Sequence, residues 1–227
     1  MPRILIESDH FLKSVPVLLD PETPEEHRRA VADFFAHDMP DFLDWCEGFR
    51  KQVPGLFPAQ VVFGEDQADF DAKLAEADLA IVESFLVTEK ALAQAKRLAA
   101  IQKFGAILSN IDLDVCAKRR IPVLPLRRVV NMAVAEQAFA LMIAHDKHIG
   151  ALNGVVTAEQ LTKAGYPIRP YDRRYSGGSN YARIPHLKTL NGAVLGIVGL
   201  GEVGRELAHR ANAFGMRIVY HQRTRVP

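Results

Sequence analysis

Short apolar segments alternate with longer amphipathic segments over roughly the first half of the chain. The apolar segments have the length and β-branched content of buried strands, and we expect strands within residues 3–7, 59–63, 79–82, 99–104 and 121–124. The segments between them repeat their apolar positions with helical spacing. A strand–helix alternation of this kind is typical of an α/β fold built on a mostly parallel sheet.

Polar residues mark the starts of several of the expected helices. The run Thr23-Pro24-Glu25-Glu26 predicts a capping box, with the threonine as N-cap and the proline at the first helical position. Thr88 predicts the start of a later helix, and either Asn110 or Asp112 predicts the start of the next one.

The segment 132–143 (MAVAEQAFALMI) is apolar on nearly every side of a helix. A helix without a polar face has to be buried on several sides, at a domain junction, at a subunit interface or in an ordinary core. Residues 165–185 follow it and are rich in Gly, Pro, Tyr and Arg, which predicts an irregular linker.

The clearest chemical signal lies near the end of the sequence. Residues 193–198 (AVLGIV) predict a strand, and Gly199-Leu200-Gly201-Glu202-Val203-Gly204 follows at once. An amphipathic helix comes next, then Gly215 and a second strand at residues 216–220 (MRIVY). The pattern G-x-G-x-x-G therefore stands in the strand–turn–helix–strand context that a dinucleotide-binding turn requires.

Each glycine of this pattern has a physical role. Gly199 permits the tight turn, Gly201 lets the backbone approach a pyrophosphate, and Gly204 lets the helix pack closely on the strand. The amides that open the helix would receive the negative charge of the phosphates. We therefore predict a cofactor site at Gly199, Gly201, Glu202, Val203 and Gly204; the alternative is a purely structural glycine turn in another α/β unit.

Two long segments resemble the D-isomer-specific 2-hydroxyacid dehydrogenases. One is LNGAVLGIVGLGEVGRELAHRANAFGMRIVYHQR, which carries the glycine turn, and the other is LAAIQKFGAILSNIDLDVCAKRRIPVLPLRRVVNMAVAEQAFALMIA. The second resembles the family's segment that joins its two lobes. The resemblance implies a two-lobed α/β protein, with a flavodoxin-like substrate lobe at residues 1–130 and a Rossmann nucleotide-binding domain at residues 131–227.

The resemblance also implies a substrate loop and marks departures from the family pattern. The family holds its substrate carboxylate with backbone amides of the loop that aligns with Gly105-Ala106-Ile107, so Ala106 and Ile107 are the candidate substrate-binding residues. Ile107 stands where a second glycine is common. Arg127 and Arg128 replace a Pro-Gly-like turn, and they either line the cleft between the lobes or are solvated surface residues.

Keto-acid reduction also needs an acid and a carboxylate-binding cation. In the resembled family an arginine, a glutamate and a histidine supply these roles, C-terminal to the part matched here. A six-stranded doubly wound domain needs about 120 residues, whereas 37 residues run from Asn191 to Pro227. We therefore expect the chain to stop after the second strand of that domain, as an incomplete reading frame or a fragment. No residue is assigned a catalytic or metal-binding role, and the chain alone is expected to be inactive.

The residues after the second strand of the glycine-turn segment bear on the choice of cofactor. NAD-binding domains place an acidic residue about 20 residues past the glycines, but here the position holds Gln222, followed by Arg223, Thr224 and Arg225. Two guanidinium groups and a hydroxyl favour a 2′-phosphate, so we predict Gln222, Arg223 and Arg225 as cofactor-binding, with NADP preferred over NAD. The alternative is that the arginines form the solvated end of a strand.

The composition of the chain bears on which kinds of partner it can bind. The chain has 28 Lys and Arg against 27 Asp and Glu, so its net charge of +1 gives no reason to expect a nucleic acid. One stretch still alternates cationic and aromatic residues, as sites that stack the bases of single-stranded nucleic acids do, so nucleic-acid binding through this stretch is an alternative. Its residues are Arg169, Tyr171, Arg173, Arg174, Tyr175, Tyr181 and Arg183. Two cysteines fit no disulfide framework, and no apolar run could cross a bilayer, so we expect a cytoplasmic location.

These observations lead to one principal functional hypothesis. We expect an oxidoreductase that transfers a hydride between NAD(P)H and a small 2-keto or 2-hydroxy acid, acting as a homodimer through its nucleotide-binding domain. The alternative is a nucleotide-sensing interaction protein of the corepressor type, which shares the resembled architecture and does not turn over a substrate.

Overall fold

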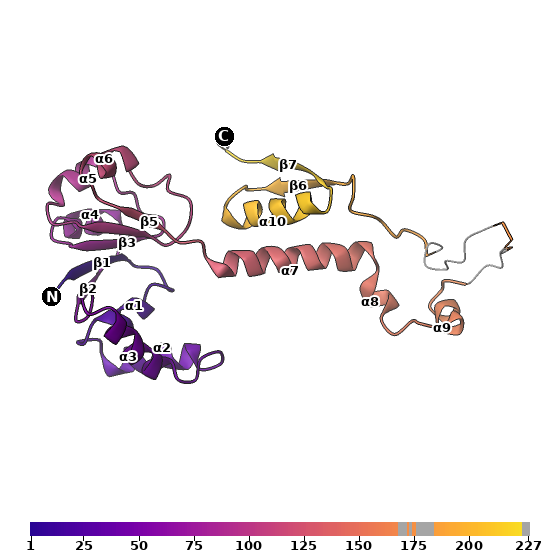
Figure 1. The fold of residues 1–227 in the computed structure, drawn as a ribbon, viewed down its shortest axis with the longest axis horizontal. Coiled ribbons are helices and arrows are strands. Elements are labelled where there is room, and N and C mark those ends of the chain that lie inside the picture. The colour runs from indigo at the N-terminus through magenta and orange to yellow at the C-terminus, as the bar shows by residue number, and fades with distance from the viewer. Residues whose placement is uncertain (168–171, 173, 176–183, 224–227) are drawn as a thin grey trace. The chain divides into compact units, whose positions relative to one another are not determined.

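Two compact units make up the chain, Met1–Arg128 and Val129–Pro227, where the sequence predicted a boundary after residue 130. The computed structural model describes residues 1–167, 172, 174–175 and 184–223 (Figure 1). Most of the predicted linker at residues 165–185 therefore lies outside the described residues.

The first unit is built on a five-stranded parallel sheet. Its strands lie in the order β2-β1-β3-β4-β5, which is the flavodoxin-like order 2-1-3-4-5. The elements in chain order are β1 (Arg3–Glu7), α1 (Ser14–Leu19), α2 (Glu25–Phe35), α3 (Phe42–Gln52), β2 (Gln60–Gly64), α4 (Gln67–Leu74), β3 (Leu79–Val82), α5 (Glu89–Gln94), β4 (Ala100–Lys103), α6 (Leu113–Lys118) and β5 (Val123–Pro125). The predicted strands are confirmed to within two residues at either end, and so is the α/β class.

Alternation along β1 explains the three layers of this unit. Leu5 points to one face of the sheet and packs with residues of α4, α5 and α6, whereas Ile4 and Ile6 point to the other face and pack with α1 and the end of α3. Helices therefore cover both faces, as Figure 1 shows. This is the arrangement that lets a parallel strand be apolar at every position.

The helix starts agree with the sequence in two cases out of three. The Thr88 side chain accepts from the Ala91 amide at the start of α5, and the Asp112 side chain accepts from the Val115 amide at the start of α6. The predicted capping box at Thr23 is wrong. The Thr23 hydroxyl donates instead to the carbonyl of Asp20, 2.9 Å away, and the residue before α2 is Pro24, which has no capping side chain.

The second unit is described from a long helix to a pair of parallel strands. Its elements are α7 (Val129–Asp146), α8 (Ile149–Leu152), α9 (Ala158–Lys163), β6 (Val194–Val198), α10 (Glu202–Ala213) and β7 (Arg217–His221). The strands β6 and β7 pair in parallel, with Leu195 opposite Ile218. Their inner side chains pack with α10 and α7 around Phe139, Ala211 and Met216.

The apolar helix α7 is buried along one line only in this chain. The buried residues Asn131, Ala135 and Phe139 follow one another at four-residue spacing, while Val134 and Leu141 on other sides are 49% and 60% exposed. Within the described residues of the second unit, α7 is therefore not buried on several sides. No helix in the described ranges, α7 included, has both the length and the apolarity needed to cross a membrane.

A buried carboxylate ties together the carboxyl ends of the central strands of the first unit. Glu7, the last residue of β1, is 4% exposed. It accepts from the amides of Glu83, Ser84 and Phe85 at 2.6, 2.8 and 3.0 Å, and also from the Ser84 hydroxyl. The loop after β3 is therefore fixed to the end of β1 by charge-assisted hydrogen bonds.

We expect Glu7→Ala to destabilise the first unit by about 3 kcal/mol, because three backbone amides lose their charged, buried acceptor. Urea unfolding followed through Trp45, the one tryptophan in the sequence, measures this, since Trp45 lies on α3 in the first unit. Glu7→Gln should lose roughly half as much, because it keeps a neutral acceptor. Glu65→Ala is the matched control, since Glu65 is exposed just past the end of β2; equal losses for Glu7→Ala and Glu65→Ala would contradict the expectation.

Candidate functional site

The glycine turn between β6 and α10 has the backbone geometry that its sequence predicted. Gly199 has φ +91°, a conformation that residues with a Cβ rarely adopt. Its amide donates to the carbonyl of His221 at the end of β7, 2.9 Å away. The chain therefore reverses sharply at the carboxyl end of β6 and enters the helix at Glu202.

The other two glycines of the turn differ in how much space surrounds them. A Cβ added to Gly204 would lie 2.5 Å from the Gly199 carbonyl oxygen and 3.3 Å from Ile197. A Cβ added to Gly201 would meet no atom within 4 Å. Gly204 is thus required by the protein's own packing, whereas the absence of a side chain at Gly201 leaves open space beside the backbone.

The first turn of α10 is held by the first turn of α7. The amide of the buried Asn131 side chain donates to the carboxylate of Glu202, the first residue of α10. The first amides of a helix have no acceptor within the helix, and they carry its partial positive charge. The bond from Asn131 fixes the one acidic side chain of this first turn to α7.

Gln222 and Arg223 follow β7 beside the turn. The Gln222 side-chain oxygen accepts from the Leu200 amide at 2.9 Å. Gln222 therefore binds the turn itself, which is a role the sequence did not indicate. Arg223 is exposed, and Thr224 and Arg225 lie outside the described residues.

Ion pairs and an aromatic contact fix the C-terminal end of α10 to α7. Arg210 donates to Glu136 of α7 at 2.7 Å and to Glu206 at 2.9 Å, and these carboxylates raise the pKa of the guanidinium. The Phe139 ring meets the Phe214 ring edge to face, with centroids 4.7 Å apart. The amphipathic character predicted for this helix is confirmed in part: Ala211 is buried, but Phe214, which directly follows α10, is half exposed.

The candidate substrate loop lies at the carboxyl end of β4 in the first unit. Gly105 is buried and has φ +152°, and its carbonyl accepts from the Leu126 amide at 2.9 Å. Ala106 is exposed and Ile107 is half-buried. The loop is therefore fixed at the glycine and presents the next residue to the surface.

Arg128 is not a solvated arginine. Its guanidinium donates to the Glu83 carboxylate at 2.8 Å and lies over the Phe104 ring, 5.2 Å from the centroid. The Arg128 side chain is only 23% exposed. Phe104 directly precedes the candidate substrate loop, so Arg128 bridges the loop after β3 and the loop after β4.

Sequence reasoning missed the polar network on which these loops rest. The buried Lys103, the last residue of β4, donates to the carbonyl of Glu83, and the Asn110 side chain donates to the carbonyl of Phe85 at 2.7 Å. Glu7 ends β1, Glu83 directly follows β3 and Lys103 ends β4, and these three parallel strands are neighbours in the sheet. That shared position was the available signal, because ends of parallel strands meet at one edge of a sheet.

No cluster of metal-ligand side chains occurs within the described parts of the chain. The two cysteines are free and buried, and burial raises the pKa of both thiols. Neither thiol is therefore activated as a nucleophile.

Comparison with known proteins gives consistent matches. Residues 139–227 match the family described as D-isomer specific 2-hydroxyacid dehydrogenase, NAD binding domain. A glyoxylate reductase of Thermococcus litoralis is 34% identical over 146 residues, which cover 63% of this chain and 40% of that protein. A 4-methyl-2-oxopentanoate reductase A of Aspergillus oryzae is 37% identical over 122 residues, or 54% of this chain and 31% of that protein.

A third relative, a D-3-phosphoglycerate dehydrogenase of Methanocaldococcus jannaschii, is 29% identical over 161 residues, covering 70% of this chain and 27% of that protein. The chain thus spans well under half the length of each of these relatives. The glycine turn and its supporting strands lie within residues 139–227, and their geometry agrees with the match of these residues to the NAD-binding domain of the D-isomer-specific 2-hydroxyacid dehydrogenases.

Proposed function

We propose that the protein to which this chain belongs transfers a hydride between a nicotinamide dinucleotide and a small 2-keto or 2-hydroxy acid. The second unit would bind the dinucleotide, and the first unit would bind the acid. The observation that carries the proposal is the contrast within the glycine turn, where Gly204 is packed against the Gly199 carbonyl and Gly201 faces open space.

The residues of the turn fit a dinucleotide pyrophosphate. Gly201 lets a phosphate oxygen approach the backbone, and the first amides of α10, at Glu202 and Val203, can donate to it with the helix dipole in their favour. The bond from Asn131 holds the Glu202 carboxylate, which limits its competition with a bound phosphate. When bound, the nicotinamide supplies or accepts the hydride.

Backbone donors in the first unit would hold the acid. The amides of Ala106 and Ile107 follow the fixed Gly105 at the carboxyl end of a parallel sheet, where α/β proteins bind their ligands. The relatives named glyoxylate reductase and 4-methyl-2-oxopentanoate reductase act, by those names, on acids with a carbonyl group next to the carboxylate. Arg128 would position this loop through its contact with Phe104.

The alternative of a corepressor-type interaction protein gains no support, because these relatives are named as reductases and dehydrogenases. A homodimer through the nucleotide-binding unit stays a prediction. The exposed Val134 and Leu141 of α7 support it, since exposed apolar side chains on a helix of this kind are typical of a surface that another chain covers.

We further infer a preference for NADP. The Gln222 oxygen already accepts from Leu200, so the group that this side chain can still offer is its amide donor, and the next residue is the exposed Arg223. Donors and a cation suit a 2′-phosphate, whereas a ribose 2′-hydroxyl is usually bound by a carboxylate at this position.

We expect Gly201→Ala to weaken NADPH binding by at least about tenfold while leaving the fold of the second unit intact, because the new methyl group meets only the ligand. Gly204→Ala should instead loosen the fold, because its methyl group would collide with a carbonyl at a cost of about 1–3 kcal/mol. Titration of NADPH fluorescence measures the first effect, and amide hydrogen exchange over residues 194–221 measures the second.

Gly196→Ala is the matched control for both variants, because a Cβ there would only touch Val219 at 4.0 Å. Unchanged NADPH binding by Gly201→Ala, in a chain whose amide exchange is also unchanged, would show that the turn is structural.

We expect Arg223→Ala to weaken NADPH binding by about ten- to a hundredfold and NADH binding by less than about threefold, since only NADPH carries the phosphate that the guanidinium would contact. Arg217→Ala is the control, because Arg217 is an exposed arginine at the opposite end of β7. The preference is wrong if the parent chain binds NADH as tightly as NADPH, or if Arg223→Ala weakens both equally.

We expect the 227-residue chain by itself to bind dinucleotide without oxidising NADPH in the presence of glyoxylate or hydroxypyruvate. The family resemblance assigns the arginine, glutamate and histidine of proton transfer to positions C-terminal to the matched segment. Absorbance at 340 nm follows the reaction, with a Gly201→Ala preparation as the control for contaminating reductases. Oxidation that is lost with Gly201→Ala would show that the chain is itself sufficient for catalysis.

A further inference from the structure

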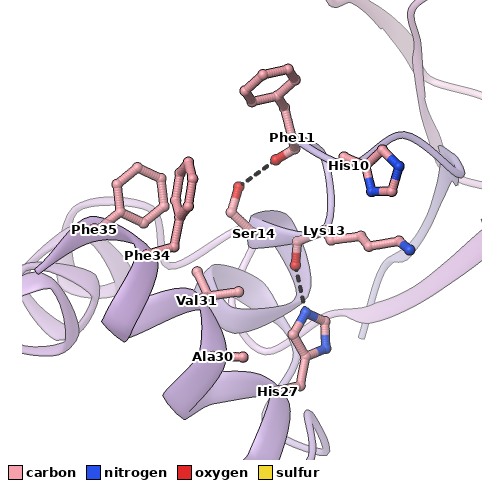
Figure 2. A pocket seen from close by; sticks show the side chains of 9 residues that line it. All are labelled: His10, Phe11, Lys13, Ser14, His27, Ala30, Val31, Phe34 and Phe35. Atoms are coloured by element: carbon pink, nitrogen blue, oxygen red, sulfur yellow. Dashed lines mark hydrogen bonds between the residues drawn. The ribbon is translucent and has the colours of Figure 1, made fainter.

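A cavity lies within the first unit, and none of the residues of the candidate substrate loop lines it. It has a volume of about 430 Å³ and lies between the segment after β1 and the helix α2. Figure 2 shows the side chains that line it. A cavity of this size is within the range of small-molecule sites.

One side of the cavity is aromatic. Phe34 and Phe11, which both line it, are 70% and 64% exposed. The Phe34 ring meets Phe35 edge to face at 5.1 Å, and Phe35 stacks on Phe42 of α3 at 4.6 Å. Phe34 and Phe35 therefore pack against neighbouring rings, and Phe34 and Phe11 expose apolar surface to water, which is unfavourable.

The ionisable side chains that line the cavity are all basic. They are His10, Lys13 and His27, and none of the acidic residues of α2 is among the lining residues. His27 Nε2 lies 2.8 Å from the carbonyl of Lys13, and because a carbonyl only accepts, this nitrogen carries the hydrogen. The bond fixes the segment that presents Lys13 against α2.

Two acidic residues close in sequence to the cavity lining have partners of their own. The Asp9 carboxylate accepts from the Phe11 amide at 2.8 Å, and Glu25 pairs with Arg29 at 3.0 Å. The cavity therefore combines an apolar surface with a positive rim. That combination matches a ligand with an apolar body and one negative charge.

We propose that this cavity binds an amphiphilic monoanion, a medium-chain fatty-acid carboxylate. Its alkyl chain lies against Phe11, Phe34 and Phe35, and its carboxylate meets the Lys13 ammonium. This proposal does not depend on the proposed dehydrogenase function, and it is tested independently of that function.

The fluorescence of Trp45 can report ligand binding in the cavity. The sequence contains one tryptophan, and its ring stacks on Phe42 with centroids 6.2 Å apart, so it is coupled to the cavity through the Phe35–Phe42 pair. We would titrate the full chain with decanoate, decan-1-ol and decyltrimethylammonium below their micelle concentrations while following Trp45 emission. Decanoate should give a saturable change and bind at least about tenfold more tightly than the other two, because only it has the charge-assisted contact.

Two substitutions separate the contribution of the Lys13 charge to binding from that of the apolar surface. Lys13→Gln should weaken decanoate binding by about tenfold and leave decan-1-ol binding unchanged, whereas Phe34→Ser should weaken the binding of both. Lys51→Gln is the matched control, because Lys51 is an exposed lysine on α3 that does not line the cavity. Neither Lys13 nor Phe34 is buried, so both variants are expected to fold.

Three results would overturn the proposal. One is equal affinity for the three amphiphiles, and another is decanoate binding that Lys13→Gln does not alter. The third is a concentration-dependent dimer, seen by sedimentation velocity, that Phe34→Ser dissociates and decanoate does not. That last result would identify the surface as a contact between two copies of the chain.

Discussion

The close approach between the first turn of α10 and the end of β6 is the constraint on which the second unit depends. A Cβ at Gly204 would stand 2.5 Å from the Gly199 carbonyl oxygen, so only glycine lets the helix lie this near the strand. From that approach follow the positive φ of Gly199, the bond from Leu200 to Gln222 and the burial of Ala211 against the sheet. The helix N-terminus is thereby aimed at the carboxyl end of the strands, where a phosphate gains most from its amides.

Much of this could be predicted from the sequence, because the determining patterns are local. A five-residue apolar strand, three glycines at fixed spacing and a helix that ends shortly before Gly215 predict the turn without any distant contact. The strands of the first unit were predictable for the same reason: buried parallel strands are continuous apolar runs. The cap at Thr88 was also local, since a threonine side chain needs only the third amide that follows it.

What the sequence did not predict depends on contacts between distant residues. Glu7 and the loop after Val82 are more than 70 residues apart, and their bond exists only because β1 and β3 are neighbours in the sheet. The pairing of Arg128 with Glu83 has the same origin. At Thr23 two local bonds competed: the hydroxyl took the nearby Asp20 carbonyl rather than an amide of α2, and a sequence pattern does not decide between them.

The two units differ in what lies against the backbone amides that follow a strand: a carboxylate of the protein itself after β3, and open space beside Gly201 after β6. In the first unit the amides that follow β3 all point at one acceptor, and the protein fills that place with its own Glu7 carboxylate. An external anion would have to displace a buried, charge-assisted group, so these amides serve stability. In the second unit the space beside Gly201 is open and the Glu202 side chain is bound by Asn131. Within the described residues, the glycine turn and the loop after Gly105 lack such a buried carboxylate of their own at the places where a dinucleotide and a keto acid are proposed to bind.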